Sequence, residues 1–450
     1  MFLTSIGQYK VVAPSLRRIA GLALPALVVL AAEPLYVLVD TAVVGHLGSG
    51  PLAALAVGGT VLTLVNWLGT ILAYGTTGRA ARRFGAGQRS EAVAEGVQAS
   101  WLAFGVGLLV AVGMQFLAEP LSRALAGGDP AIWQDAASWL RVAALGAPGL
   151  MLAVAGNGWL RGVQDTRRPL SYVVGAFTLS AVLCPILVYP AGLGLVGSAI
   201  ANVIAQTLAG LLFVRALLAE RVDFKPRPAV MREQLVVGRD LLLRGLAFQA
   251  CFLSATAVAA RFGTTALAAH QIALQLWFFT ALILDAVAIA AQSLIGAELG
   301  AGRAAEARWL AGRITVIGAL SGLVFAFVIG VGAAWLPGWF SSDPQVQAQA
   351  LVAWPWFVAM QPLAGIVFAL DGVLIGAGDV RYMRNLTLVA TLCGFLPAVW
   401  LTYGLNLGLG GIWAGLSLFI VIRLVALLAR LRSGKWAVVG AQLTRAHATS

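Results

Sequence analysis

The chain has 450 residues, of which 60% are hydrophobic and 11% are charged, with a formal net charge of +12. Its mean hydropathy is +0.89. These values exclude a soluble globular protein and predict a membrane protein that crosses the bilayer several times.

Twelve apolar stretches are long enough to cross a bilayer, which takes about 20 residues. They lie near residues 19–45, 52–78, 93–117, 136–160, 170–190, 195–218, 241–262, 267–297, 310–336, 352–376, 386–404 and 409–431. The predicted fold is therefore an all-α polytopic membrane protein with twelve transmembrane helices, six in each half.

The two halves repeat each other at a shift of about 215 residues. Leu52-Ala53-Ala54 returns as Leu267-Ala268-Ala269, and Leu193-Gly194-Leu195 returns as Leu407-Gly408-Leu409. Two similar helical halves in a membrane protein are typical of transporters that bind their substrate between the halves. We predict two pseudo-symmetric six-helix bundles, an N-lobe (1–218) and a C-lobe (241–432), joined by a cytoplasmic linker (219–240) and followed by a cytoplasmic tail (433–450).

Basic residues alternate along this map. They gather after the second, fourth, eighth and tenth spans, at Arg79, Arg82, Arg83, Arg89, Arg161, Arg167, Arg168, Arg303, Arg308, Arg313, Arg381 and Arg384. The loops after the first, fifth, ninth and eleventh spans contain no Lys or Arg. This alternation places both termini in the cytoplasm. The net charge therefore orients the protein, and no nucleic-acid partner is expected.

Neither a metal nor a cofactor is expected. Cys184, Cys251 and Cys393 lie in separate spans without metal-ligand spacing, so packing is their predicted role. The three histidines form no zinc cluster. Catalytic motifs such as H-E-x-x-H and G-x-S-x-G are absent, which disfavours an intramembrane enzyme.

Four acidic residues, Glu33, Asp40, Asp285 and Asp371, lie well inside spans. Because a charge at bilayer depth costs at least about 2.5 to 3.5 kcal/mol, each is a candidate for ion or substrate binding. Asp40 is the predicted ion-coupling acid, and Glu33 relays protons to it or serves as a second cavity acid. Pro25 and Pro34 on the same helix are a predicted hinge, because an interior proline frees a carbonyl and bends a helix.

Asp371 occupies the repeat position of Asn157, so the two lobes would differ in charge at equivalent places. We predict that both residues line the substrate or ion cavity. Asp285 either joins that cavity or pairs with an arginine such as Arg244.

Several mid-span amides could line the cavity or hold helices together, among them Asn66, Asn202 and Gln275. Arg244 and Arg423 are predicted to extend toward the cytoplasmic surface.

The first span resembles the first helix of the multidrug and toxic compound extrusion (MATE) family, at Leu24-Pro25, Glu33-Pro34 and residues 38–48. It is most similar to the branch of DNA-damage-inducible protein F (DinF). Further matches lie at Thr76-Thr77-Gly78, Leu284-Asp285, and Leu370-Asp371-Gly372, so the resemblance covers both halves.

The resemblance implies a twelve-helix antiporter with two bundles around a central cleft. It assigns ion coupling to Asp40, with further acids at Asp371 and Asp285. The acid that sodium-coupled members of another branch carry on helix 7 is missing near Gln249, and the fifth-helix aspartate of archaeal members is missing near Ser180. Both departures favour protons over sodium.

The predicted function is export of organic compounds, cationic or amphipathic, in exchange for protons, with sodium as the alternative ion. The alternatives are an exporter of organic anions resembling citrate or bile salts, and a flippase for a lipid-linked precursor. We expect a monomer in the lipid bilayer of a bacterial inner membrane, with a small-molecule substrate.

Overall fold

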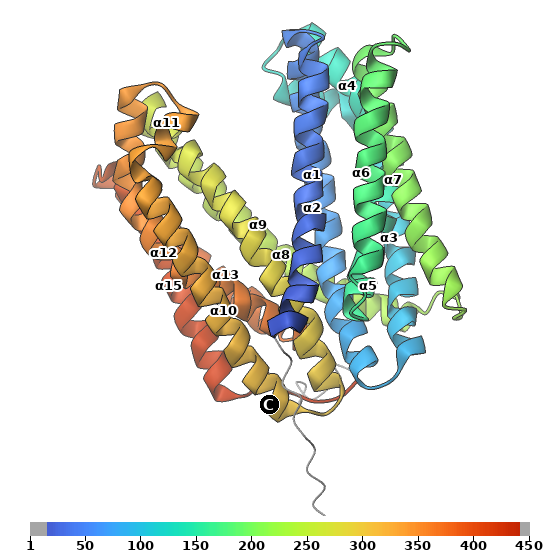
Figure 1. The fold of residues 1–450 in the computed structure, drawn as a ribbon. Coiled ribbons are helices and arrows are strands. Elements are labelled where there is room, and N and C mark those ends of the chain that lie inside the picture. Colours follow the sequence, from blue (N-terminus) through green and yellow to red (C-terminus); the bar gives the residue numbers. More distant parts are fainter. Residues whose placement is uncertain (1–15, 442–450) are drawn as a thin grey trace, which may run out of the picture.

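The computed structural model describes residues 16–441, and every element in that range is helical (Figure 1). The first half contains α1 (Leu16–Gly45), α2 (Ser49–Gly85), α3 (Arg89–Leu125), α4 (Pro130–Ala144), α5 (Ala147–Gly162), α6 (Arg167–Val188) and α7 (Gly194–Ala219). The second half contains α8 (Pro228–Arg261), α9 (Thr264–Gly300), α10 (Ala304–Val331), a 3-10 turn (Gly332–Ala334), α11 (Leu336–Phe340), α12 (Pro344–Gly376), α13 (Val380–Val389), a π-helical turn (Ala390–Phe395), α14 (Leu396–Gly404) and α15 (Gly408–Ser433).

Eleven spans in the described range are long and apolar enough to cross a membrane, one of which runs through α13, the π-helical turn and α14. A twelfth forms if α4 and α5, which meet at an angle of 52°, count as one broken span. The predicted all-α polytopic fold is confirmed. The break is specific to the first half, because its counterpart α12 is continuous despite Pro355 and Pro362.

The sequence repeat is also a repeat of backbone geometry. The turn after α2 contains Gly87 at φ 77°, and the equivalent turn after α9 contains Gly302 at φ 80°. Both glycines are in the left-handed region that a residue with a Cβ rarely adopts. The turn after α5 uses Gln164 at φ 63° where its counterpart uses Gly378 at φ 77°.

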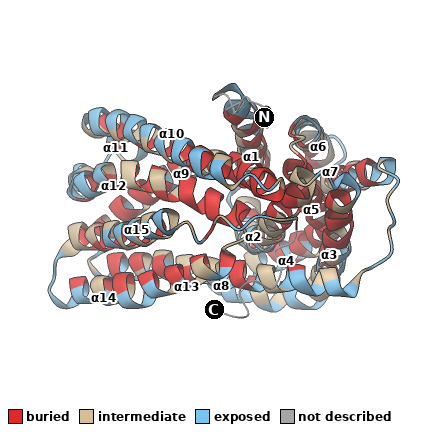
Figure 2. Ribbon diagram, turned by 90° about the horizontal axis from the view of Figure 1, so that it is seen from below, coloured by how far each residue is buried: buried red, intermediate tan, exposed pale blue. Residues whose placement is uncertain are grey.

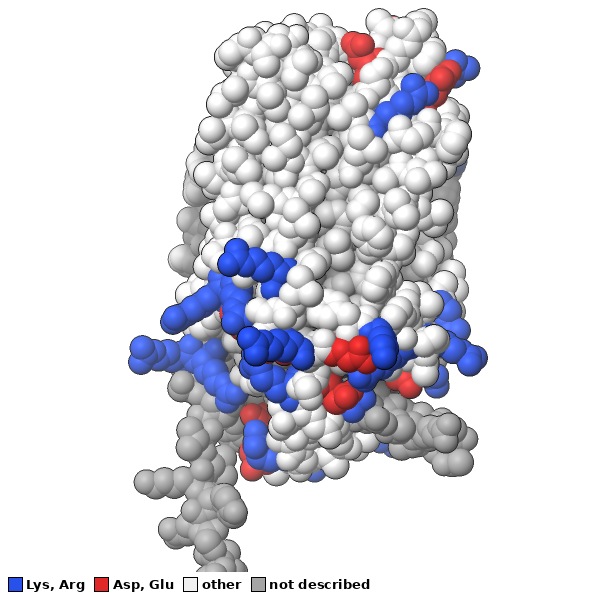
Figure 3. Space-filling model, turned by 90° about the vertical axis from the view of Figure 1, so that its right-hand side faces the viewer, with Lys and Arg blue, Asp and Glu red and all other residues white. Residues whose placement is uncertain are grey.

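The outer surface of the helices is apolar. Figure 2 shows buried residues facing between helices and exposed residues on the outside of each bundle. Large side chains on that outer surface include Phe116, 76% exposed, and Phe327, 71% exposed. Figure 3 shows the same organisation on one side of the molecule, where a broad uncharged band separates a strongly basic end from the opposite end. Such a band is expected of a surface that contacts lipid.

The two bundles meet at the basic end and diverge toward the end that carries α4 and α11 (Figure 1). At the meeting point, α2 of the N-lobe crosses α9 of the C-lobe. A Cβ at Gly85 would collide with the backbone of Ala297, and a Cβ at Gly300 would collide with the backbone of Arg82. Residues 82 and 85 are the repeat equivalents of 297 and 300, so the crossing is self-complementary, as at a two-fold interface.

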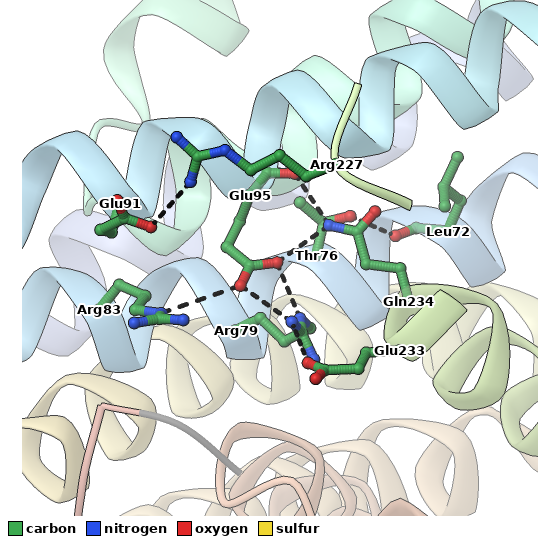
Figure 4. A network of polar contacts seen from close by, with 9 residues as sticks. All are labelled: Leu72, Thr76, Arg79, Arg83, Glu91, Glu95, Arg227, Glu233 and Gln234. Carbon is green, nitrogen blue, oxygen red and sulfur yellow. Dashed lines mark hydrogen bonds and ion pairs between the residues drawn. The ribbon is translucent and has the colours of Figure 1, made fainter. Parts of the chain in front are cut away.

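The connection between the lobes is shorter than predicted, because α8 begins at Pro228. Figure 4 shows how the first turns of α8 are held by the N-lobe. The carboxylate of Glu95 on α3 accepts hydrogen bonds from Arg79 at 2.8 and 2.9 Å and from Gln234 at 3.0 Å. Arg79 also pairs with Glu233 at 2.8 Å. Residues 228–240, predicted as part of the linker, therefore form a helix that packs on the N-lobe.

The segment after α15 crosses back under both lobes. Arg82 on α2 donates to the carbonyl oxygens of Val438 at 3.0 Å and Gly440 at 3.1 Å. The backbone N–H of Gly440 donates to the carbonyl of Leu299 on α9 at 3.0 Å. Trp436 is buried. Residues 434–441 of the predicted tail thus hold the basic ends of both lobes together.

Candidate functional site

A cavity of about 240 Å³ lies in the C-lobe, among α8, α9, α12 and α15. The N-lobe reaches it through Tyr74 on α2. Its wall is rich in aromatic side chains, including Phe248, Trp277, Phe278, Phe368, Trp413 and Phe419. Such walls bury the apolar body of a ligand, and a few polar groups then fix its orientation.

Asp371 and Asp285, both predicted cavity residues, line this cavity. Asp371 is buried on α12 and accepts hydrogen bonds from two arginines. Arg244 on α8 donates to it at 2.5 Å, and Arg423 on α15 donates to its two carboxylate oxygens at 2.8 and 2.6 Å. The carboxylate is therefore already neutralised by the protein.

The prediction for Arg244 and Arg423 was wrong. Arg423 is only 2% exposed, and its guanidinium stacks 4.7 Å from the ring of Phe248 and 5.6 Å from that of Phe419. Arg244 lies 5.2 Å from the same Phe248 ring. Both residues face inward because the Asp371 carboxylate and the aromatic rings stabilise them better than a path along lipid to the surface.

Asp285 on α9 accepts a hydrogen bond from the hydroxyl of Tyr74, so this contact joins the two lobes. Arg161 on α5 and Arg244 lie close enough to interact with it electrostatically. Within residues 17–441, however, Asp285 forms no direct ion pair, and Arg244 pairs with Asp371 instead.

Asp40 occupies a separate place in the N-lobe. It is 5% exposed on α1, and Cys184 on α6 donates to it at 3.2 Å. Tyr36, one turn earlier, lies beside Ser180 and Asn202. In the described part of the chain, no Lys, Arg or His forms an ion pair with Asp40. Charging a buried carboxyl without a counter-charge is costly, so its protonation is coupled to whether water reaches it.

The remaining predicted site residues are spread over both lobes. Glu33 accepts a hydrogen bond of 2.5 Å from Asn66 on α2, so these two predicted residues meet. Asn202 is buried near Tyr36. Asn157 is half-buried on α5, and Gln275 is exposed on α9. Asn66, Asn157, Asn202 and Gln275 are not among the residues that line the C-lobe cavity.

Pro25 and Pro34 lie inside α1, which stays continuous. Because Pro25 has no N–H, the carbonyl of Gly21 lacks its helical partner. The hydroxyl of Thr166, in the connection between α5 and α6, donates to that carbonyl at 3.4 Å. One freed backbone group of the predicted hinge is therefore satisfied by a neighbouring element.

No group of three or more His, Cys, Asp or Glu residues suited to a metal ion occurs among residues 16–441. Sequence reasoning missed Tyr74 and the pairing of Asp371 with two arginines. The sequence did contain a signal for the pairing of Asp371 with Arg423. The repeat position of Arg423 is Ala209 and that of Asp371 is Asn157, so neither charge has a counterpart in the first half. Two charges of opposite sign that appear together in one half only are candidates for a pair.

Comparison with known proteins gives consistent results. The family model MatE matches residues 25–186 and again residues 241–400, once in each half. Protein DETOXIFICATION 44, chloroplastic, of Arabidopsis thaliana is 35% identical over 93% of this chain and 83% of its own length. DNA damage-inducible protein F of Escherichia coli strain K12 is 32% identical over 92% of each chain.

Solved structures share the fold at lower identity. A crystal structure of MATE in the bent conformation superposes with a TM-score of 0.85 at 23% identity, covering 94% of this chain and 95% of the other. An outward-facing multidrug resistance MATE family transporter of the MOP superfamily gives 0.83 at 24% identity, covering 95% and 97%. With the family model matching both halves, the chain belongs to the multidrug and toxic compound extrusion (MATE) family.

Proposed function

We propose that this protein is a proton-coupled antiporter that exports amphipathic organic compounds. The observation that carries the proposal is that the buried acid Asp40 and the cavity lie in different lobes. The N-lobe buries Asp40 without a counter-charge among the residues that the structure describes, and the C-lobe contains an aromatic-rich cavity. Ion and substrate would then bind in different lobes, and each would favour a different arrangement of the two.

The helix α1 provides a physical link between these sites. Ile19 and Leu22, near its start, pack into the apolar core of the C-lobe. Asp40, near its other end, contacts Cys184 on α6 of the N-lobe. Pro25 and Pro34 lie between these contacts, and α1 would bend there when Asp40 gains a proton and loses its charge.

Transport in proteoliposomes tests the function. The purified transporter is reconstituted in the inside-out orientation, with a fluorescent amphipathic compound outside the vesicles. A lumen more acidic than the outside should drive uptake of the compound, and reversing this pH gradient should stop it. A sodium gradient at constant pH should have no effect. Uptake driven by sodium alone would establish sodium, the alternative coupling ion.

The charge of the cavity revises the expected substrate. Two acids and two arginines line it, so it has no formal net charge, and Asp371 is not free to bind a cation. We therefore place neutral, zwitterionic or weakly charged amphipathic compounds before simple organic cations. The second candidate is an organic anion, because Arg161 adds a positive charge behind Tyr74. Competition by matched cationic and anionic compounds separates the two.

We further propose that the basic end faces the cytoplasm of a bacterial cell and that the protein acts as a monomer in the inner membrane. The basic end seen in Figure 3 supports this orientation. Reporter fusions after Gly48 and after Pro190 should be periplasmic, and one after Asp223 should be cytoplasmic. A periplasmic reporter at Asp223 would contradict the orientation.

A further inference from the structure

We propose that Arg423 determines which charge of substrate the cavity accepts, because its positive charge balances the acids of the cavity wall. The inference rests on the proposed function, because it concerns selection at the same cavity. It gives a specific role to Arg423, whose repeat position in the N-lobe is occupied by the uncharged Ala209.

The position of Arg423 is fixed from several sides. Its Nη2 donates to both oxygens of Asp371, and its guanidinium lies over the rings of Phe248 and Phe419. With 2% of its surface exposed, its side chain is almost entirely enclosed in this arrangement. A buried guanidinium held by a carboxylate and two rings acts as a fixed charge of the cavity wall.

Arg244 is a second guanidinium on the same carboxylate, so positive charges outnumber negative ones around Asp371. Asp371 has one negative charge and contacts two guanidinium groups, so this triad has one positive charge in excess. The second acid of the wall, Asp285, brings the formal charge of the lining to zero. Removing Arg423 would leave Asp371 paired with Arg244, and the lining would then have one net negative charge.

Arg244 and Arg423 each have a hydrogen-bond donor without an acceptor among residues 17–441. These two donors are the Nε atoms, and both are buried. Buried donors normally have partners. Both residues line the cavity, but a substrate acceptor could reach these two atoms only after the side chains shift.

The pair belongs to the C-lobe alone. At the repeat positions of Arg423 and Asp371 the N-lobe has Ala209 on α7 and Asn157 on α5. The charged pair is therefore specific to the C-lobe, where the cavity lies.

Three variants place the formal charge of the lining in a series. Arg423→Gln gives −1, Asp371→Asn gives +1, and the double variant returns the lining to zero, as in the unmodified protein. Arg430→Gln is the matched control. Arg430 lies two turns further along α15, and it pairs with Asp379 at 2.6 Å outside the cavity.

Binding to the purified full-length protein in detergent should be measured with two probes of the same aromatic body, 2-naphthyltrimethylammonium and naphthalene-2-sulfonate. Trp277 and Trp413 in the wall provide an intrinsic fluorescence signal. Two unit charges at about 4 Å interact strongly even at an effective dielectric of 20, so Arg423→Gln should raise the ratio of ammonium to sulfonate affinity about tenfold or more. Asp371→Asn should lower the ratio, and the double variant should restore it.

A purely structural role of Arg423 would weaken both probes together and leave the ratio unchanged. An unchanged ratio in a folded Arg423→Gln protein, or an equal change in Arg430→Gln, would overturn the proposal, as would the failure of every variant to bind either probe. Because binding is measured without a gradient, a shifted ratio alongside absent proton-driven export would reject only the proposed function. Proton-driven export with an unchanged ratio would reject only the role of Arg423.

Discussion

Replacing Asp40 by asparagine is expected to abolish proton-driven export and to leave the amount of folded protein in the membrane close to normal. Asparagine keeps the size of the side chain and can still accept from the thiol of Cys184, but it cannot gain or lose a proton. Because the protein offers Asp40 no counter-charge in the described range, the substitution removes a costly charge and not a stabilising pair.

The measurement is uptake into proteoliposomes across a range of pH around neutrality. Asp135→Asn, which removes an exposed acid of the same lobe, is the control and should transport normally. Glu33→Gln distinguishes a relay from a cavity acid. A relay residue should slow transport at every substrate concentration, whereas a cavity acid should mainly change the apparent affinity. If Asp40→Asn follows the unmodified pH profile, Asp40 has a structural role and the coupling scheme is wrong.

Replacing Gly85 by alanine is expected to prevent close approach of the two lobes at the basic end. A Cβ at this position would overlap the backbone of Ala297, which cannot move aside as a flexible side chain could. Overpacking of this kind costs about 1–3 kcal/mol. If that cost falls only on the closed arrangement, its population relative to the alternative falls by roughly 5- to 150-fold.

Gly300→Ala should act in the same way, since a Cβ there would meet the backbone of Arg82. Spin labels at the exposed Ser90 and its repeat equivalent Ala305, in a background without native cysteines, would report the distance between the lobes at this end. Both glycine variants should shift the distance distribution to longer values and reduce transport. Gly59→Ala is the control, because open space surrounds that helical position. A shift in the control, or none at Gly85, would contradict the prediction.

The general fold could be predicted from the sequence because its determinants are local. Runs of apolar residues define spans, arginines at their ends define orientation, and the repeat of Leu193-Gly194-Leu195 defines two bundles. The break at residues 145–146 could not be predicted, because Pro148 beside it has a repeat equivalent, Pro362, that lies inside the continuous α12. Whether a proline or glycine breaks a span depends on neighbouring helices that satisfy its freed groups.

The candidate site was predictable in part. An acid inside an apolar span stands out in the sequence, because burying its charge in the bilayer costs free energy and is rare without a function. This identifies Asp40, Asp285 and Asp371. The partner of such an acid is harder to recognise, because the residues that meet Asp371 lie 52 and 127 positions away in the chain, and only the uneven charge of the two halves indicates Arg423. Cavity walls are equally hidden in sequence, since Trp277 in the cavity and Phe327 on the lipid side are both aromatic residues of apolar helices.

The crossing of α2 and α9 has a consequence for the origin of this architecture. Residues 78, 81 and 85 of one lobe and their equivalents 293, 296 and 300 of the other meet their partners reciprocally: Gly78 faces the carbonyl of Ile375, Ser293 donates to that of Arg161, and Ala81 meets Gly296. A surface that complements its own copy is what a homodimer requires. An ancestral six-helix chain could have paired with a second copy of itself through this surface, in the same orientation in the membrane. Fusion of the two copies would then allow each to change alone, so that one lobe could acquire an arginine–aspartate pair that the other lacks.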